Sequence, residues 1–445
     1  MSRNEATVEQ LLGLLPDVDE LELLRLTIIG TAVPDPGKAW DSSSAYATVD
    51  KRIVSADEVD RAVRQAEESL REHIASLYEG LRPVFRSFFE GREDDAGRQL
   101  VVLGEQLEGR GRMKAARQCY RTALNLSLPL LDKGPQILAL RRIGRVSLTL
   151  GDFHEAALHY ERSAQLARDA GETRGEVVAR TGYGNVLAWQ GRWSEAERHY
   201  RDALALLEAE DGDRPSVERA QLLNNLGNIA TWLQRLDEAE ATLTQALSMS
   251  DSLGSAPDLA VGFVHLAHLR ERQQRPDEAR QAYERALGLP VPPSLQSGIA
   301  TDLADLYLQS GHLTRAEEWS RVAEEHAIRA GSAYTLGRMY QGRGNIARAR
   351  GDEDGFTFFE KALEIARDKG YPFLEAETLA EYAELRRHTG GTEEAEAYLE
   401  RAREIFASLG AVQSVADADR VLEEIRVERT VVEVPPETPL AAAGD

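Results

Sequence analysis

Small and large apolar residues recur along this chain at fixed distances from a turn residue. After Gly191, Ala196 and Ala203 follow at five and twelve residues, with Tyr200 between them at nine. Spacings of four and three residues place these side chains on one face of a helix. The pattern predicts an amphipathic helix that begins just after Gly191 and buries this face.

The same spacing returns through most of the chain, with about 40 residues between turns. The turn residues are Gly111, Gly151, Gly191, Gln234, Gln274, Gly311, Gly351 and Gly390. Seven residues before each turn stands a small residue, in order Gly104, Gly144, Gly184, Gly227, Ala267, Ala304, Gly344 and Ala383. A small residue there lets a first helix approach its neighbours closely, so each unit is predicted to be a helix hairpin. The unit at Gly351 fits only if one residue is missing from its turn, and Gly288 and Pro290 shorten the fifth unit.

The strings GRWSEAERHYRDAL, QRLDEAEATLTQAL and QRPDEARQAYERAL resemble the tetratricopeptide repeat family. The usual period of that family is about 34 residues, and the longer period here is similar to its kinesin light chain branch. The resemblance implies an all-α fold, a right-handed superhelical solenoid of about eight repeats over residues 96–426. HEAT-like repeats are the rival fold, but they lack this phasing of small residue, turn, Ala, Tyr and Ala.

The two ends of the chain do not follow the repeat. Residues 1–95 are expected to contain two short amphipathic helices, TVEQLLGLL from Thr7 and then DELELLRLTII. A polar connection with Pro, Gly and Ser follows, and a long helix is expected to start near Ser55. We interpret this region as a helical cap on the solenoid, with a distinct signalling domain as the alternative. Residues 427–445 are expected to form a mobile tail.

Charge and cysteine content narrow the classes of function. The 445-residue chain carries a formal net charge of −22, which argues against general binding to nucleic acid or to anionic lipid. Cys119 is the single cysteine, so intramolecular disulfides are excluded. The amino terminus lacks the layout of a secretory signal, and we therefore expect a cytoplasmic protein.

No motif in the sequence predicts catalysis, a metal or a cofactor. Gly182 and Gly184 could suggest a phosphate-binding loop, but no strand precedes them, and we assign them to a helix that packs closely on its neighbour. His265 and His268 lie three residues apart without the glutamate of a zinc-protease motif. We therefore expect a protein that is not an enzyme, with no catalytic residues, no metal site and no cofactor.

Each predicted first helix carries a polar residue six residues before its turn, and some also carry polar residues nine or ten residues before it. In the tetratricopeptide repeat family these helices line a concave groove, and asparagines there hold an extended peptide backbone because an amide both donates and accepts. Arginines add a bidentate grip on a carboxylate. The predicted peptide-binding residues are Arg141, Arg142, Arg145, Asn185, Asn224, Asn225, Asn228, His265, His268 and Asn345.

Three functions remain open from the sequence. The leading hypothesis is a non-enzymatic scaffold that binds an extended peptide segment of a partner protein in the groove. The alternative is a regulatory protein that senses a peptide or small ligand, with groove occupancy repositioning the amino-terminal region. The third is an enzyme hidden within residues 1–95. A homodimer is plausible, because uncapped solenoid ends expose apolar faces.

Overall fold

The computed structural model describes residues 5–7, 53–55, 81, 83–330 and 332–433. Strands β1 (Glu5–Thr7) and β2 (Ile53–Ser55) pair antiparallel, with Ala6 opposite Val54. Thr7, where the sequence suggested the start of a helix, therefore lies in a strand. The other helices expected before residue 81 lie outside the described residues.

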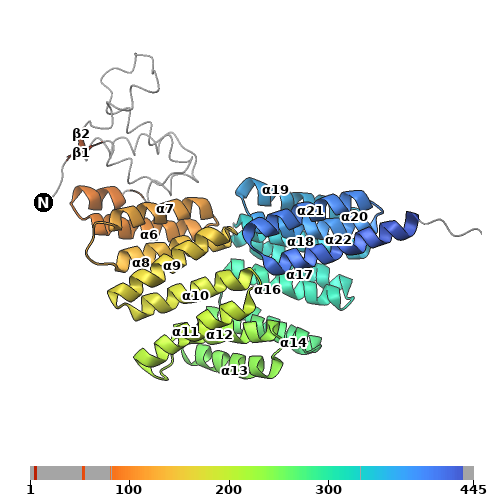
Figure 1. The fold of residues 1–445 in the computed structure, drawn as a ribbon, viewed down its shortest axis with the longest axis horizontal. Helices are drawn as coiled ribbons and strands as arrows, with labels where there is room; N and C mark the ends of the chain where they lie inside the picture. The colour runs from red at the N-terminus through yellow and green to blue at the C-terminus, as the bar shows by residue number, and fades with distance from the viewer. Residues whose placement is uncertain (1–4, 8–52, 56–80, 82, 331, 434–445) are drawn as a thin grey trace, which may run out of the picture. The chain divides into compact units, whose positions relative to one another are not determined.

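Helices make up most of the rest of the described chain, and from α6 to α21 they form hairpins that follow one another in sequence order (Figure 1). The first four are α6 (Glu93–Gly109) with α7 (Met113–Ser127), α8 (Gly134–Thr149) with α9 (Phe153–Ala170), α10 (Thr173–Trp189) with α11 (Trp193–Asp211), and α12 (Val217–Trp232) with α13 (Leu236–Ser252). The next four are α14 (Ala256–Arg272) with α15 (Pro276–Leu287), α16 (Pro293–Gln309) with α17 (Leu313–Ala330), α18 (Ala333–Arg350) with α19 (Asp354–Lys369), and α20 (Pro372–His388) with α21 (Thr392–Leu409). A single helix, α22 (Val412–Glu433), follows them and continues past residue 426, where the sequence suggested the end of the array. These hairpins confirm the predicted all-α solenoid.

The hairpins belong to two compact units. The amino-terminal unit is centred on α6 to α15, and the carboxyl-terminal unit on α16 to α22. First helices of neighbouring hairpins contact one another at three places, α6 with α8, α12 with α14, and α18 with α20. At these places the first helices lie side by side.

The predicted turn residues share one backbone conformation. Every glycine among them has a positive φ, for example 74° at Gly191 and 85° at Gly390. Gln234 and Gln274 have φ values of 61° and 58°, which are uncommon for residues other than glycine. The left-handed residue lies in the turn between the first and second helix of each hairpin. The turn positions predicted from the sequence are therefore confirmed.

The small residues before the turns meet the rings that the spacing predicted. A Cβ atom added at Gly184 would lie 2.5 Å from Cε1 of Tyr200, and one at Gly344 would lie 2.6 Å from Cε1 of Phe359. Gly182 lies as closely against Tyr160, in the middle of α10. The glycines of this stretch therefore serve helix packing, as the sequence indicated.

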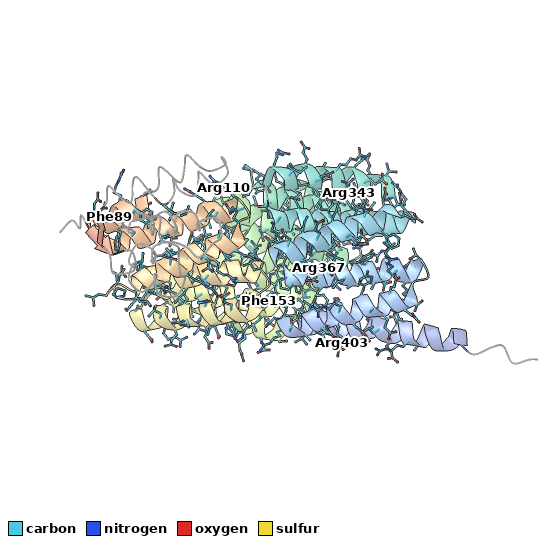
Figure 2. The ribbon with its side chains drawn as sticks, turned by 90° about the horizontal axis from the view of Figure 1, so that it is seen from above. Phe89, Arg110, Phe153, Arg343, Arg367 and Arg403 are labelled. Atoms are coloured by element: carbon cyan, nitrogen blue, oxygen red, sulfur yellow. The ribbon has the colours of Figure 1, made fainter. Side chains whose placement is uncertain are left out.

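Ion pairs join neighbouring helices at the surface, and Figure 2 labels two of the arginines that form them, Arg367 and Arg403. Arg367 near the end of α19 lies 2.8 Å from Glu375 on α20, and Arg403 on α21 bonds with Asp419 on α22. Exposed pairs of this kind contribute roughly 0–1 kcal/mol each, so the buried rings and alanines provide most of the stability.

Candidate functional site

A cavity of about 320 Å³ lies against the first helices of the amino-terminal unit. Its wall includes Arg141, Arg142 and Arg145 from α8, Tyr160 from α9, and Asn185 from α10. The structure thus brings four of the predicted peptide-binding residues into one cavity.

The three arginines differ in their partners. Arg142 bonds with Glu105, and Nη2 of Arg145 donates to Oε2 of Glu108 at 2.7 Å. Arg141 has no hydrogen-bond or ion-pair partner among the described residues, and its Nε atom is buried. Burial lowers the pKa of Arg141, and the positive charges of Arg142 and Arg145 lower it further. The negative charge of Glu172 acts in the opposite direction, but no described carboxylate pairs with Arg141 directly.

Tyr160 adds a second unsatisfied group to this cavity. Its side chain is only 5% exposed, and its hydroxyl has no partner among the described residues. Burial raises the pKa of Tyr160 to about 12, so the hydroxyl keeps its proton and can donate. The equivalent tyrosines are satisfied: Tyr120 donates to Glu108 at 2.9 Å, and Tyr200 donates to Oδ1 of Asn185 at 2.7 Å.

The asparagines have different surroundings. Oδ1 of Asn185 also accepts from Nδ2 of Asn225 at 3.1 Å, while Nδ2 of Asn185 has no partner among the described residues. Asn224 is only 1% exposed and donates to the backbone oxygen of Asp258 at 3.1 Å. It therefore joins two hairpins and is not exposed to a groove, unlike our expectation. Asn228 keeps a buried Oδ1 without a partner.

The two histidines lie outside this cavity. Their ring centroids are 6.4 Å apart, and burial, with a smaller contribution from His268, lowers the pKa of His265 to about 3. His265 is therefore neutral at physiological pH. Among the described residues no group of three or more His, Cys, Asp or Glu side chains could hold a metal ion.

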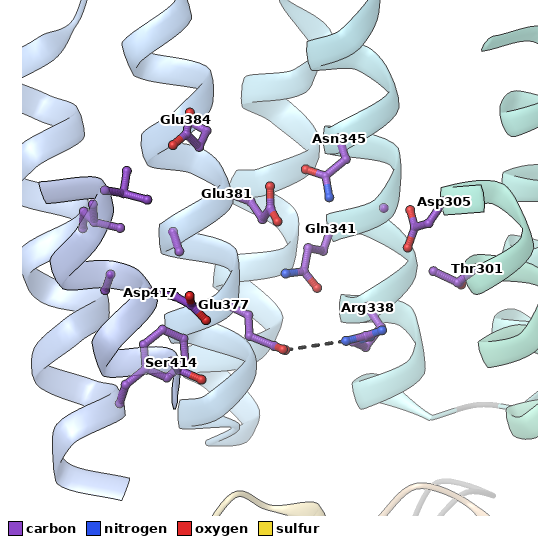
Figure 3. A pocket seen from close by; sticks show the side chains of 16 residues that line it. Thr301, Asp305, Arg338, Gln341, Asn345, Glu377, Glu381, Glu384, Ser414 and Asp417 are labelled. Atoms are coloured by element: carbon purple, nitrogen blue, oxygen red, sulfur yellow. Dashed lines mark ion pairs between the residues drawn. The ribbon is translucent and has the colours of Figure 1, made fainter. Parts of the chain in front are cut away.

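Asn345 belongs to the carboxyl-terminal unit, where it lines a different cavity of about 380 Å³ (Figure 3). Arg338, Gln341, Glu377 and Glu381 line this cavity with it, and none of them was among our predicted site residues. Gln341 and Glu381 stand at the ten-before and nine-before positions of their units, so a fuller reading of the repeat would have found both. Arg338 stands outside those positions, and no sequence signal marked it.

Comparisons with known proteins agree with the repeat. The tetratricopeptide repeat family matches residues 218–289, 335–408 and, through a second description of the same repeat, 182–210. The regulatory protein AfsR of Streptomyces griseus is 31% identical over 147 residues, which are 33% of this chain and only 15% of that relative.

Solved structures show a similar fold. A Rap protein complexed with competence and sporulation factor has a TM-score of 0.52 at 14% identity, over 84% of this chain and 94% of that one. Yeast Tom70 has a TM-score of 0.42 at 12% identity, over 85% of this chain and 94% of that one. No helix in the described part of the chain is long and apolar enough to cross a membrane. The repeat matches and the helix hairpins around them show that this chain contains tetratricopeptide repeats.

Proposed function

We propose that this protein is a non-enzymatic interaction protein that binds an extended, acidic peptide segment along the first helices of the amino-terminal unit. The observation that carries the proposal is the unpaired guanidinium of Arg141 in the wall of a cavity. An acidic side chain or a terminal carboxylate of the guest occupies this cavity.

The cavity offers an anion more than one donor. Arg142 and Arg145 already have carboxylate partners, so the charge without a partner is that of Arg141. A guanidinium can hold a carboxylate by two parallel hydrogen bonds, and the Tyr160 hydroxyl adds a third donor. Partial burial strengthens each of these bonds relative to water.

The guest backbone is held by side-chain amides of α10 and α12. The unpartnered amide of Asn185 can donate to a peptide carbonyl, and Oδ1 of Asn228 can accept from a peptide N–H. Each such bond contributes about 0.5–1.5 kcal/mol net, so useful affinity needs several of them together with the carboxylate.

A sensing role is the second candidate, favoured by the similarity to a protein named as a regulator. The structurally similar Rap protein was solved with a bound factor, which fits either role. In the sensing version, occupancy of the groove repositions residues 1–95. Small-angle scattering with and without a saturating acidic peptide separates the two, because sensing predicts a changed radius of gyration and a rigid scaffold does not.

Fluorescence anisotropy tests the main proposal on the full chain. The probe is a labelled alanine-based peptide with two glutamates, and its control carries two glutamines. Arg141→Gln is expected to weaken binding of the glutamate peptide at least about tenfold, because hydrogen bonds to charged groups are worth roughly 1.5–3 kcal/mol. Arg198→Gln, on the exposed face of α11, removes the same charge away from the cavity and should change little. Equal affinity for the two peptides, or equal effects of the two substitutions, would contradict the proposal.

A further inference from the structure

The cavity of about 380 Å³ in the carboxyl-terminal unit is built from first helices and from α21 and α22. Thr301 and Asp305 come from α16, Gln341 from α18, Glu377 from α20, and Asp417 from α22. Figure 3 shows these polar side chains around one space, with Arg338 paired to Glu377 on one side. Carboxylates outnumber cations in this wall, since Glu381 and Glu384 line it as well.

Arginines behind the wall neutralise part of this charge. Arg348 lies 3.0 Å from Glu381, and Arg387 lies 3.6 Å from Glu384. Glu377 is different, because its contact with Arg338 is 3.6 Å long and its Oε2 atom is buried without a hydrogen bond. A buried carboxylate that lacks donors is costly, and a donor from a guest would relieve that cost.

Gln341 gives independent evidence for a guest. Its side chain is only 8% exposed, lines the cavity, and has no hydrogen-bond partner among the described residues. Buried amides are normally satisfied by protein groups or by water. In Figure 3 the Gln341 amide extends from α18 toward the same space as the Glu377 and Glu381 carboxylates.

The opposite part of the wall is apolar. Ala380, Leu399, Phe406, Ala418 and Val421 line it, and Phe406 is buried. An apolar wall beside carboxylates suits a side chain with an aliphatic stem and a positive tip, as in arginine and lysine.

We propose that this cavity binds a basic side chain, an arginine or lysine of a guest peptide, with its stem against Leu399 and Phe406 and its charged tip between Glu377 and Gln341. The Gln341 carbonyl and the Glu377 carboxylate accept hydrogen bonds from the tip. The proposal stands apart from the site at Arg141, because every residue in it belongs to the carboxyl-terminal unit.

The test uses the full chain and a labelled alanine-based peptide with two arginines. Its control peptide carries citrulline, which has the shape of arginine without its charge. We expect the arginine peptide to bind and the citrulline peptide to bind at least about tenfold more weakly. Glu377→Gln and Gln341→Leu should each weaken binding of the arginine peptide by a similar factor.

Glu364→Gln is the matched control, since Glu364 is exposed on α19 and lies outside the cavity. The whole chain is acidic, so the arginine peptide could be attracted by the net charge alone. In that case Glu377→Gln and Glu364→Gln would weaken its binding equally, and that result would overturn the proposal. Binding of spermidine without binding of the arginine peptide would overturn the assignment to a peptide side chain. Circular dichroism of each variant confirms that the helices are retained.

Discussion

The two units use the same hairpin but differ in the polar groups on their first helices. In the amino-terminal unit the cavity wall carries arginines and an asparagine, and Nε of Arg141 is buried without a partner among the described residues. In the carboxyl-terminal unit the wall carries mainly carboxylates, and Oε2 of Glu377 is buried without a hydrogen bond from any described residue. The repeat thus fixes the buried face of each helix and leaves the inner polar face free to vary.

The buried aromatic position differs in the same way. Tyr120, Tyr200 and Tyr283 in the amino-terminal unit each direct a hydroxyl to a polar side chain of the paired first helix. The corresponding residues Phe359 and Leu399 in the carboxyl-terminal unit have no hydroxyl. Tyrosine hydroxyls therefore bond with polar side chains of first helices in the amino-terminal unit. Phe359 and Leu399 offer no such bond in the carboxyl-terminal unit.

The largest expected effect comes from these rings. Tyr200→Ala and Phe359→Ala should each lower the free energy of unfolding by about 3–5 kcal/mol, because both rings are fully buried. Tyr200→Phe should cost only about 1 kcal/mol, the value of its bond to Asn185. Phe359→Tyr should also be destabilising, because Phe359 is fully buried and an added hydroxyl would overfill its packed site. Urea unfolding measures all four, and a neutral Phe359→Tyr would remove this difference between the units.

The next effect concerns pH. Burial raises the pKa of Glu377 above its ordinary value, although Arg338 opposes this, and Asp305, Glu381 and Asp417 line the same cavity. Glu377 is charged above its raised pKa and loses its charge as the pH falls through it. Binding of the arginine peptide should therefore weaken as the pH is lowered from about 8 through this raised pKa.

Binding of the glutamate peptide serves as the comparison. Arg141 stays protonated as the pH is lowered, and a glutamate in a peptide has a pKa of about 4.3. Binding of the glutamate peptide should therefore change little above about pH 5.5. Parallel titrations by anisotropy check both. A similar loss for both peptides would mean that pH acts on the fold and not on Glu377.

A smaller effect is expected for stability at Arg141. Removing this charge by Arg141→Gln should leave the free energy of unfolding unchanged or raise it by up to about 1 kcal/mol, since no partner is lost and repulsion from Arg142 and Arg145 is relieved. Arg145→Gln should lower it, because Glu108 loses a donor at 2.7 Å. Thermal unfolding measures the difference, and a clear loss of stability on Arg141→Gln would argue for a structural role.

The smallest effect lies in the turns. Gln234 and Gln274 have a left-handed conformation that glycine adopts without strain. Gln234→Gly and Gln274→Gly should therefore each raise the free energy of unfolding by up to about 1 kcal/mol. Gly390→Gln in the carboxyl-terminal unit should cost a similar amount, although a side chain there would have room. Chemical unfolding of the three variants checks these signs.

Most of the fold was predictable, because the repeat constrains buried positions. Gly184 must be small to admit Tyr200, and Gly191 must turn the chain, so both leave a signal in the sequence. The division into two units left no such signal. The residues of the site were only partly predictable, because the partner of each polar side chain comes from a neighbouring hairpin. The pairing of Arg145 with Glu108, which leaves Arg141 as the unpaired charge, cannot be read from spacing.

One measurement tests the central claim, that two cavities of one repeat array prefer opposite charges. The glutamate and arginine peptides are each titrated into the full chain carrying either Arg141→Gln or Glu377→Gln. We predict that Arg141→Gln weakens only the glutamate peptide and Glu377→Gln weakens only the arginine peptide, each at least about tenfold. Equal effects of both substitutions on both peptides, or no effect of either, would contradict the account.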